Sequence, residues 1–318
     1  MSPATRWSAE RITLEIGRLL AEDARPDNAE EREMTRLAAV AILTESAVTH
    51  VRKGDSGLLA PGLWTAGRVL EAEPLGARGR SVAQRFYLLA GLVLHWHVEI
   101  AVGHELLVKA LRSFPDDPEL LTALGSIIET VASLREYQLP PGSPDATARN
   151  LGGYRSEGEG HGGSLAGASL VQAEGRYERA LMQDPRLDEA RLRLARVRLL
   201  QGRADDALGD LERVAAEARQ PRQRYLARLF EGRARETLRD LTGAAAAFRA
   251  CAVHVPRAQT ALLALGRSLD GLGDKLGAQE AFASASAPGA PFDPWWSYKA
   301  GQPERFDDLV AELRGLVR

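Results

Sequence analysis

Small residues recur along this chain at nearly constant spacing, and this recurrence limits what the chain can fold into more than any other feature. The steps between successive members are 34, 70, 37 and 34 residues, and the members are Gly91, Gly125, Ala195, Gly232 and Gly266. A period of roughly 20–50 residues is typical of a linear array in which each unit buries its apolar face against its neighbours. The number of domains in this chain therefore cannot be estimated from the usual domain length of about 150 residues.

A second series of small residues marks a partner helix in each unit. Its steps are 34, 37 and 34 residues, and its members are Ala173, Ala207, Ala244 and Ala278. Four residues after each member stands a larger apolar residue: Tyr177, Leu211, Phe248 and Phe282. Small residues allow the two helices of a hairpin to approach closely, and the large side chain fills the space that they leave. The two series together predict tandem helical hairpins.

Apolar residues lie at helical spacing almost everywhere, and no segment alternates as a strand does. Residues 11–22, 29–52 and 58–71 each read as a helix before the repeats begin. Prolines at the ends of several units, Pro115, Pro185 and Pro256, are expected to stop the second helix, because proline cannot donate the next backbone hydrogen bond. The sequence therefore predicts an all-α protein.

The repeating unit resembles the tetratricopeptide repeat (TPR). The clearest unit spans residues 261–285, and the residues in the family's positions are Leu262, Leu265, Gly266, Leu269, Gly273, Ala278 and Phe282. Residues 191–214 match nearly as well, residues 177–185 resemble a second-helix ending, and residues 84–117 fit more loosely. The unit around Gly232 departs from the pattern, because Arg228 and Glu231 occupy positions that are usually apolar. The resemblance covers roughly residues 84–290 and implies a right-handed α-solenoid of stacked antiparallel helical hairpins.

The repeat pattern also predicts how the chain is organised. Residues 1–83 are expected to form degenerate helical hairpins, and residues 84–293 the TPR-like repeats. The 70-residue step is explained by a flexible, glycine-rich insertion at residues 139–164, inside one hairpin. Residues 294–318 are expected to cap the array, and Trp295 and Trp296 either plug its open end or dock a partner.

Composition argues against several classes of protein. The formal net charge of −2 is unlike that of a dedicated nucleic-acid binder. A single cysteine allows neither an internal disulfide nor a cysteine-based zinc site. The longest apolar stretch, residues 86–102, is too short and too polar to span a membrane, and the N-terminus lacks the apolar core of a signal peptide. We expect a cytoplasmic protein, unless the true start lies upstream.

Motifs that could carry catalysis are weak. His95 and His97 face opposite sides of a helix, and neither the pair of His95 and Glu99 nor the pair of His97 and His104 has a third ligand on its own helix. The GDSG of residues 54–57 lies in a helical context, and the glycine-rich insertion lacks the ending of a phosphate-binding loop. We therefore predict no enzyme, no metal and no cofactor. Two alternatives stay open: an enzyme or metal-binding protein that uses the histidine-rich N-terminal half, and a structural oligomer that packs through its ends.

Three repeats carry an arginine directly after the small residue of the first helix and a leucine one helical turn earlier. These residues are Arg196, Arg233 and Arg267, with Leu192, Leu229 and Leu263. The resemblance implies that they line a concave groove, in which a protein or peptide with acidic and apolar side chains would bind. The competing interpretation is that Glu236 and Asp270, three residues after their arginines, pair with them on a solvated surface. The predicted function is a protein-protein interaction scaffold.

Overall fold

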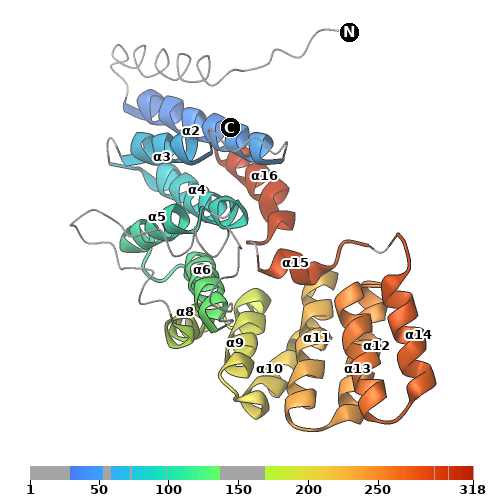
Figure 1. Ribbon diagram of the computed structural model, residues 1–318. Coiled ribbons are helices and arrows are strands. Elements are labelled where there is room, and N and C mark those ends of the chain that lie inside the picture. The colour runs from blue at the N-terminus through green and yellow to red at the C-terminus, as the bar shows by residue number, and fades with distance from the viewer. Residues whose placement is uncertain are drawn as a thin grey trace, which may run out of the picture. The chain divides into compact units, whose positions relative to one another are not determined.

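A computed structural model describes residues 29–52, 59–71, 74–97, 99–136, 169–289, 291–299 and 301–317. The described residues form helices and no strand, which confirms the all-α prediction. The chain divides into two compact units (Figure 1). Unit 1 comprises Met1–Pro115 and Ala300–Arg318, and unit 2 comprises Asp116–Lys299. None of the described helices is long and apolar enough to cross a membrane.

Unit 1 is built from helices that are far apart in sequence. Its elements are α2 (Ala29–Arg52), α3 (Leu59–Glu71), α4 (Ala77–Trp96), α5 (Ile100–Ser113), η2 (Pro303–Arg305) and α16 (Phe306–Leu316). The last helix, α16, packs against α4 and α2. Its residues Phe306, Leu309 and Leu313 are buried, and Arg52 Nη1 donates to Asp307 Oδ1 at 2.7 Å. One face of α16 is therefore part of the core of unit 1.

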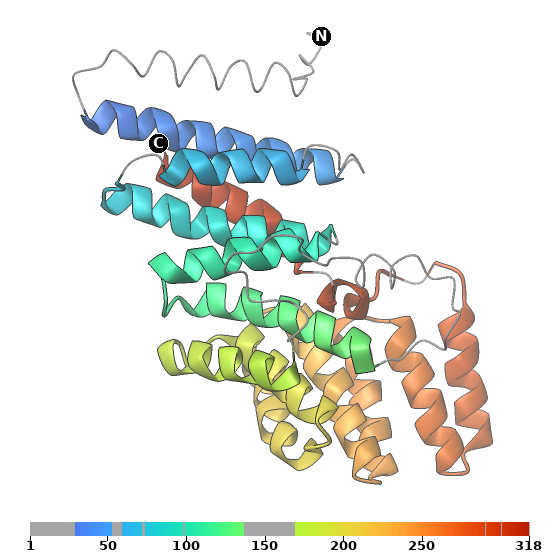
Figure 2. The same ribbon diagram turned by 60° about the vertical axis from the view of Figure 1, so that its left-hand side comes forward.

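Unit 2 is a stack of helical hairpins. Its helices are α6 (Pro118–Glu136), α8 (Leu170–Gln183), α9 (Asp188–Leu200), α10 (Ala204–Glu217), α11 (Pro221–Thr237), α12 (Leu241–His254), α13 (Gln259–Gly271), α14 (Lys275–Ser286) and α15 (Pro294–Tyr298). The hairpins pair α6 with α8, α9 with α10, α11 with α12 and α13 with α14, and Figure 2 shows them stacked along the unit. We call α6, α9, α11 and α13 the first helices.

The predicted pairing of a small residue with a large one holds the hairpins together. A Cβ atom on Gly232 would lie 2.3 Å from the Phe248 ring, and a Cβ atom on Gly266 would lie 2.5 Å from the Phe282 ring. The same relation joins Gly125 to Tyr177, at 2.6 Å, although the two residues flank the long insertion in sequence. Only glycine allows such an approach, so α6 and α8 form one hairpin like the others.

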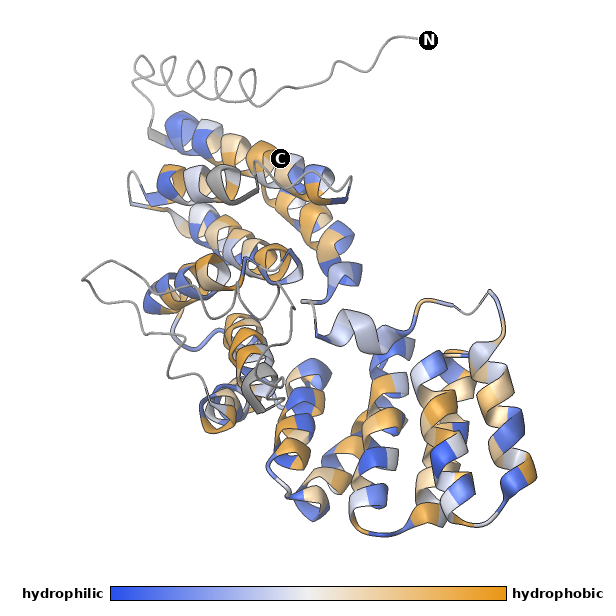
Figure 3. Ribbon diagram, viewed as in Figure 1, coloured by the Kyte–Doolittle hydropathy of each residue, from blue (hydrophilic) through white to orange (hydrophobic). Residues whose placement is uncertain are grey.

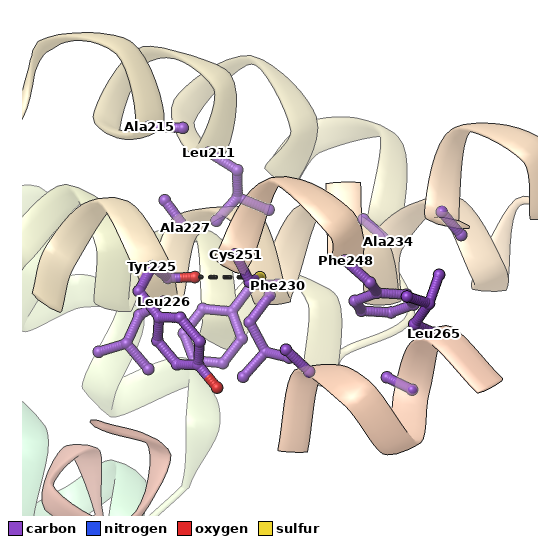
Figure 4. Packing of buried hydrophobic residues seen from close by; sticks show 14 of the residues in the cluster. Leu211, Ala215, Tyr225, Leu226, Ala227, Phe230, Ala234, Phe248, Cys251 and Leu265 are labelled. Carbon is purple, nitrogen blue, oxygen red and sulfur yellow. Dashed lines mark hydrogen bonds between the residues drawn. The ribbon is translucent and has the colours of Figure 1, made fainter. Parts of the chain in front are cut away.

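The core of unit 2 lies between neighbouring hairpins. Hydrophobic and hydrophilic residues alternate around its helices (Figure 3), as amphipathic packing requires. Around α11, Tyr225 and Phe230 pack with Phe248 and Cys251, whose Sγ lies 3.7 Å from the Tyr225 carbonyl oxygen (Figure 4). Burial raises the pKa of the Cys251 thiol to about 12, with a smaller effect of Asp293, so the thiol is neutral at physiological pH.

The atypical repeat around Gly232 is explained by ion pairs. The buried Glu231 accepts hydrogen bonds from Arg228 Nη1 at 2.7 Å and from Arg235 Nε at 3.0 Å. Arg228 therefore neutralises Glu231 locally, and the two charged residues fit positions that are usually apolar.

The compact units begin and end at other residues than the domains predicted from the repeat pattern. The predicted boundary after residue 83 falls inside α4, and the predicted cap, residues 294–318, is divided after Lys299. The reason is that α15 packs against α11, in unit 2, whereas α16 packs against α4 and α2, in unit 1. Phe282, on the last hairpin of unit 2, keeps 37% exposure. The insertion at residues 139–164 lies outside the described residues.

Candidate functional site

The three predicted arginines lie on successive first helices of unit 2: Arg196 on α9, Arg233 on α11 and Arg267 on α13. Burial lowers the pKa of Arg233, and the positive charges of Arg267 and Arg196 lower it further. The charges of Arg196 and Arg267 thus both act on the guanidinium group of Arg233.

Only one of the two expected neutralising pairs forms. Arg233 Nη1 donates to Glu236 Oε2 at 3.0 Å, whereas Asp270 accepts from Lys275 Nζ at 2.7 Å instead of pairing with Arg267. Arg267 is exposed and has no carboxylate partner among the described residues. The row of arginines therefore carries positive charge that its own repeats do not neutralise.

Arg196 is the buried member of the row. Its side chain keeps only 9% exposure, and its Cζ lies 5.2 Å from the ring centroids of both Phe230 and Trp295. Its Nε is enclosed without a hydrogen-bond acceptor within the described part of the chain. The Nε donor of this buried guanidinium is therefore unused.

The leucines expected beside the arginines lie in different environments. Leu192 and Leu229 are 0% and 2% exposed and belong to the core of unit 2, so they cannot line a surface for a partner. Leu263 is 42% exposed. The difference arises because α9 and α11 have hairpins on both sides, whereas α13 belongs to the last hairpin of the unit. Only Leu263 is available next to the arginines.

The segment after the last repeat returns to the first helices and ends in α15. The buried Asp293 anchors it, because its carboxylate accepts from Tyr225 Oη at 2.9 Å and from the Thr260 backbone nitrogen at 2.7 Å. Asp293 also caps α15 through the Trp295 backbone nitrogen at 3.0 Å. These bonds tie the start of α15 to α11 and α13.

Two residues of this return segment join the arginines, and sequence reasoning missed this role. The Trp295 ring meets Phe230 edge to face, with centroids 5.7 Å apart, and stacks on Tyr298. Lys299 Nζ lies 4.8 Å from the Trp295 ring centroid. Burial and the charge of Arg196 lower the pKa of Lys299, while Glu129 opposes them. The available signal was the cluster of aromatic residues, but spacing alone does not tell which helix such a cluster covers.

A buried polar network fixes the other end of α15. Glu129 on α6 accepts from Tyr177 Oη at 2.7 Å and from Tyr298 Oη at 2.6 Å. Arg193 on α9 donates from Nη1 to Glu129 at 3.3 Å, from Nη2 to the Tyr298 carbonyl at 3.0 Å, and from Nε to Glu189 at 2.8 Å. The side chains of Arg193, Glu129 and Glu189 are at most 4% exposed. Each charge in this network has a partner, which suits a structural role.

Glu189 gives the network a pH dependence. Its second oxygen accepts from Arg222 Nη1 at 2.9 Å and from Gln223 Nε2 at 3.3 Å. Burial alone would raise the pKa of Glu189, but the charges of Arg222 and Arg193, with the hydrogen bond from Gln223, lower it from 4.5 to about 2. A carboxylate with a lowered pKa stabilises the fold above its unfolded pKa and loses that contribution as the pH falls.

We expect unit 2 to lose about 3 kcal/mol of stability from this one group between pH 5 and pH 2. The variant Glu189→Gln cannot titrate here, so its stability should fall less over the same interval. Denaturant unfolding at several pH values measures the difference, and Glu212→Gln, whose side chain is 52% exposed, is the control that should behave as the wild type. The prediction would be contradicted if the free energy of unfolding fell equally with pH in the wild type and in Glu189→Gln.

The structure describes some of the residues behind the catalytic alternative. His95 is buried in α4. Among the described residues, no group of three or more His, Cys, Asp or Glu side chains is arranged to hold a metal ion. The GDSG of residues 54–57 lies outside the described residues.

Comparisons with known proteins agree with this architecture. A family profile described as "Tetratricopeptide repeat" matches residues 165–229. A solved tetratricopeptide repeat protein from Parabacteroides merdae is 13% identical, covers 87% of this chain and 91% of its own, and has a TM-score of 0.53. PilF of Pseudomonas aeruginosa is 15% identical, with 74% and 90% covered and a TM-score of 0.51. MamA from Desulfovibrio magneticus RS-1 is 18% identical, with 67% and 95% covered and a TM-score of 0.45.

No curated protein sequence matches the chain. Two of these solved structures have TM-scores above 0.5 and share its fold, and the family profile covers α8, the hairpin of α9 and α10, and the first part of α11. The chain therefore matches the tetratricopeptide repeat profile over residues 165–229 and has the fold of these solved proteins.

Proposed function

We propose that this chain is a protein-protein interaction scaffold, and that its partner binds to the surface formed by Arg196, Arg233, Arg267 and the exposed Leu263, which we call the arginine face. The observation that carries the proposal is the uncompensated charge of this face. The charges of Arg196 and Arg267 both act on Arg233, and Glu236 is the only carboxylate that pairs with any of the three arginines among the described residues. Tetratricopeptide repeats generally serve as binding scaffolds, so the proposal is a binding function and not a catalytic one.

The arginine face indicates the chemistry of the partner. Arginine binds carboxylates through two parallel hydrogen bonds, and Leu263 offers apolar surface one turn before Arg267. A protein or peptide segment that carries both acidic and apolar side chains matches these two features. Surface ion pairs individually contribute only about 0–1 kcal/mol, so such a segment needs several contacts at once.

The proposal is tested by photo-crosslinking in cells of the source organism. A photoreactive side chain at position 263 should become linked to one partner protein, whereas the same group at position 253, where Val253 is 79% exposed on α12, should not. Arg233→Glu with Arg267→Glu should abolish the crosslink at position 263 while helicity is unchanged.

The matched control is Arg213→Glu with Arg249→Glu, which makes the same change of charge on the second helices α10 and α12. This control should crosslink as the wild type does. A crosslink that survives the change of Arg233 and Arg267, or that forms equally from position 253, would contradict the proposed binding surface.

A further inference from the structure

We propose that Arg196, Trp295 and Lys299 form a binding site for a side-chain carboxylate of the partner, built by a repeat helix and the return helix α15 together. This inference rests on the proposed function and deepens it, because it assigns one ligand group to one place. Trp295 and Lys299 lie beyond the last hairpin of the unit, which ends at Ser286. The site is therefore not a property of the repeats alone.

Arg196 differs from the other arginines of α9. Arg191 donates to Asp210 at 2.8 Å, Arg193 bonds to Glu189 and Glu129, and Arg198 pairs with carboxylates of α8 and α10. Arg196 keeps only 9% exposure, so it is 91% buried. It nevertheless has no carboxylate partner within the described residues. A buried charge is costly unless it is paired, so this guanidinium is prepared for an anion.

The aromatic neighbours of Arg196 leave its hydrogen-bonding capacity unused. A guanidinium is attracted to the face of an aromatic ring, as with Phe230 and Trp295. A ring face is not a strong hydrogen-bond acceptor, however, so it does not satisfy the N–H donors. The missing acceptor must be negatively charged and must reach a nearly enclosed group. A carboxylate is small and planar, and it can accept two parallel N–H bonds from one guanidinium.

Lys299 adds a second positive charge at the same place. Its ammonium group lies 4.8 Å from the ring centroid of the same Trp295 that Arg196 contacts at 5.2 Å. Two cations on one ring repel each other, and a carboxylate bound between them would relieve this repulsion. Charge complementarity therefore favours an acidic side chain of the partner.

The site is held in place before any ligand arrives. Asp293 fixes the start of α15 through Tyr225 and the Thr260 backbone, and Tyr298 fixes its end through Glu129. Trp295 lies between these two anchors and stacks on Tyr298 with an angle of 12° between the rings. A ligand then does not have to order α15, which reduces the entropic cost of binding.

The test uses the full chain with ¹⁵N-labelled arginine and tryptophan and two small probes, N-acetyl-glutamate amide and N-acetyl-glutamine amide. The glutamate probe should shift the Arg196 Nε–H signal in a saturable manner, and the uncharged glutamine probe should not. Arg196→Gln should remove the accompanying shift of the Trp295 indole N–H signal. Lys299→Gln, a change of an exposed side chain, should weaken binding of the glutamate probe several-fold. Arg191→Gln, on the same helix, should leave it unchanged.

Three results with the small probes would overturn the carboxylate site. The first is equal binding of the two probes, and the second is binding unchanged by both Arg196→Gln and Lys299→Gln. The third is saturation by N-acetyl-phosphoserine amide without saturation by the glutamate probe, which would indicate a phosphate site. Crosslinking from position 263 separates this inference from the proposed function. If Arg196→Gln and Lys299→Gln leave the crosslink intact while the change of Arg233 and Arg267 abolishes it, the scaffold function stands and the carboxylate site does not.

Discussion

Replacing Arg193 by methionine is expected to lower the free energy of unfolding of unit 2 by about 3–5 kcal/mol. The side chain of Arg193 is 1% exposed and is bonded to Glu129, Glu189 and the Tyr298 carbonyl. Methionine fills much of the space but leaves two buried carboxylates without this partner. Removing one member of a buried ion pair costs more than the pair itself contributes, because the remaining charge stays in a medium of low polarity.

Amide hydrogen exchange in α9 and α11, combined with denaturant unfolding, measures this loss within unit 2. The matched control is Arg196→Met, one turn along the same helix, because Arg196 has no carboxylate partner among the described residues and its removal leaves no anion unpaired. Combining Arg193→Met with Glu129→Gln and Glu189→Gln should recover part of the stability. Equal losses for Arg193→Met and Arg196→Met would show that side-chain volume, and not charge, determines the effect.

The hairpins could be predicted because their signal is local. Gly232 and Phe248 are 16 residues apart, and the same offset joins Gly266 to Phe282, so the pattern is visible in one sequence. The close approach of each ring to its glycine is the contact that the pattern implies. Periodicity also predicts that Arg196, Arg233 and Arg267 form one row, and the charges of Arg196 and Arg267 both lower the pKa of Arg233.

The return of α15 to the first helices could not be predicted in this way. Its contacts join residues far apart in sequence: Tyr298 and Glu129 are separated by 169 positions, and Arg193 and Tyr298 by 105. A repeat pattern predicts which residues occupy equivalent positions in successive hairpins. It does not predict which other parts of the chain pack on those residues. For the same reason the burial of Leu192 and Leu229, and the exposure of Leu263, appear only in the structure.

The sequence also did not indicate which cation each carboxylate would pair with. Glu236 and Asp270 each follow their arginine by three residues in the sequence, yet Glu236 pairs with Arg233 while Asp270 pairs with Lys275. The second outcome depends on where the next helix begins, because α14 starts at Lys275. Spacing on one helix therefore predicted one of the two pairs correctly and left Arg267 without its expected partner.

Phe248 and Phe282 occupy the same position in successive repeats, yet we expect very different losses when each is replaced by alanine. Phe248 is 2% exposed, so Phe248→Ala should cost about 3–5 kcal/mol through lost burial and the cavity that remains above Gly232. Phe282 keeps 37% exposure, so Phe282→Ala should cost at most about 2 kcal/mol. Each variant is the control for the other, because the chemical change and the facing glycine are the same.

Denaturant unfolding at several protein concentrations gives the answer. A loss for Phe282→Ala as large as that for Phe248→Ala would contradict the prediction, because the outer side of Phe282 would then have to be covered in solution. If that larger loss also grew with protein concentration, the cover would be a second copy of the chain, since only association makes apparent stability depend on concentration. The last hairpin would then be an interface through which the chain packs end to end.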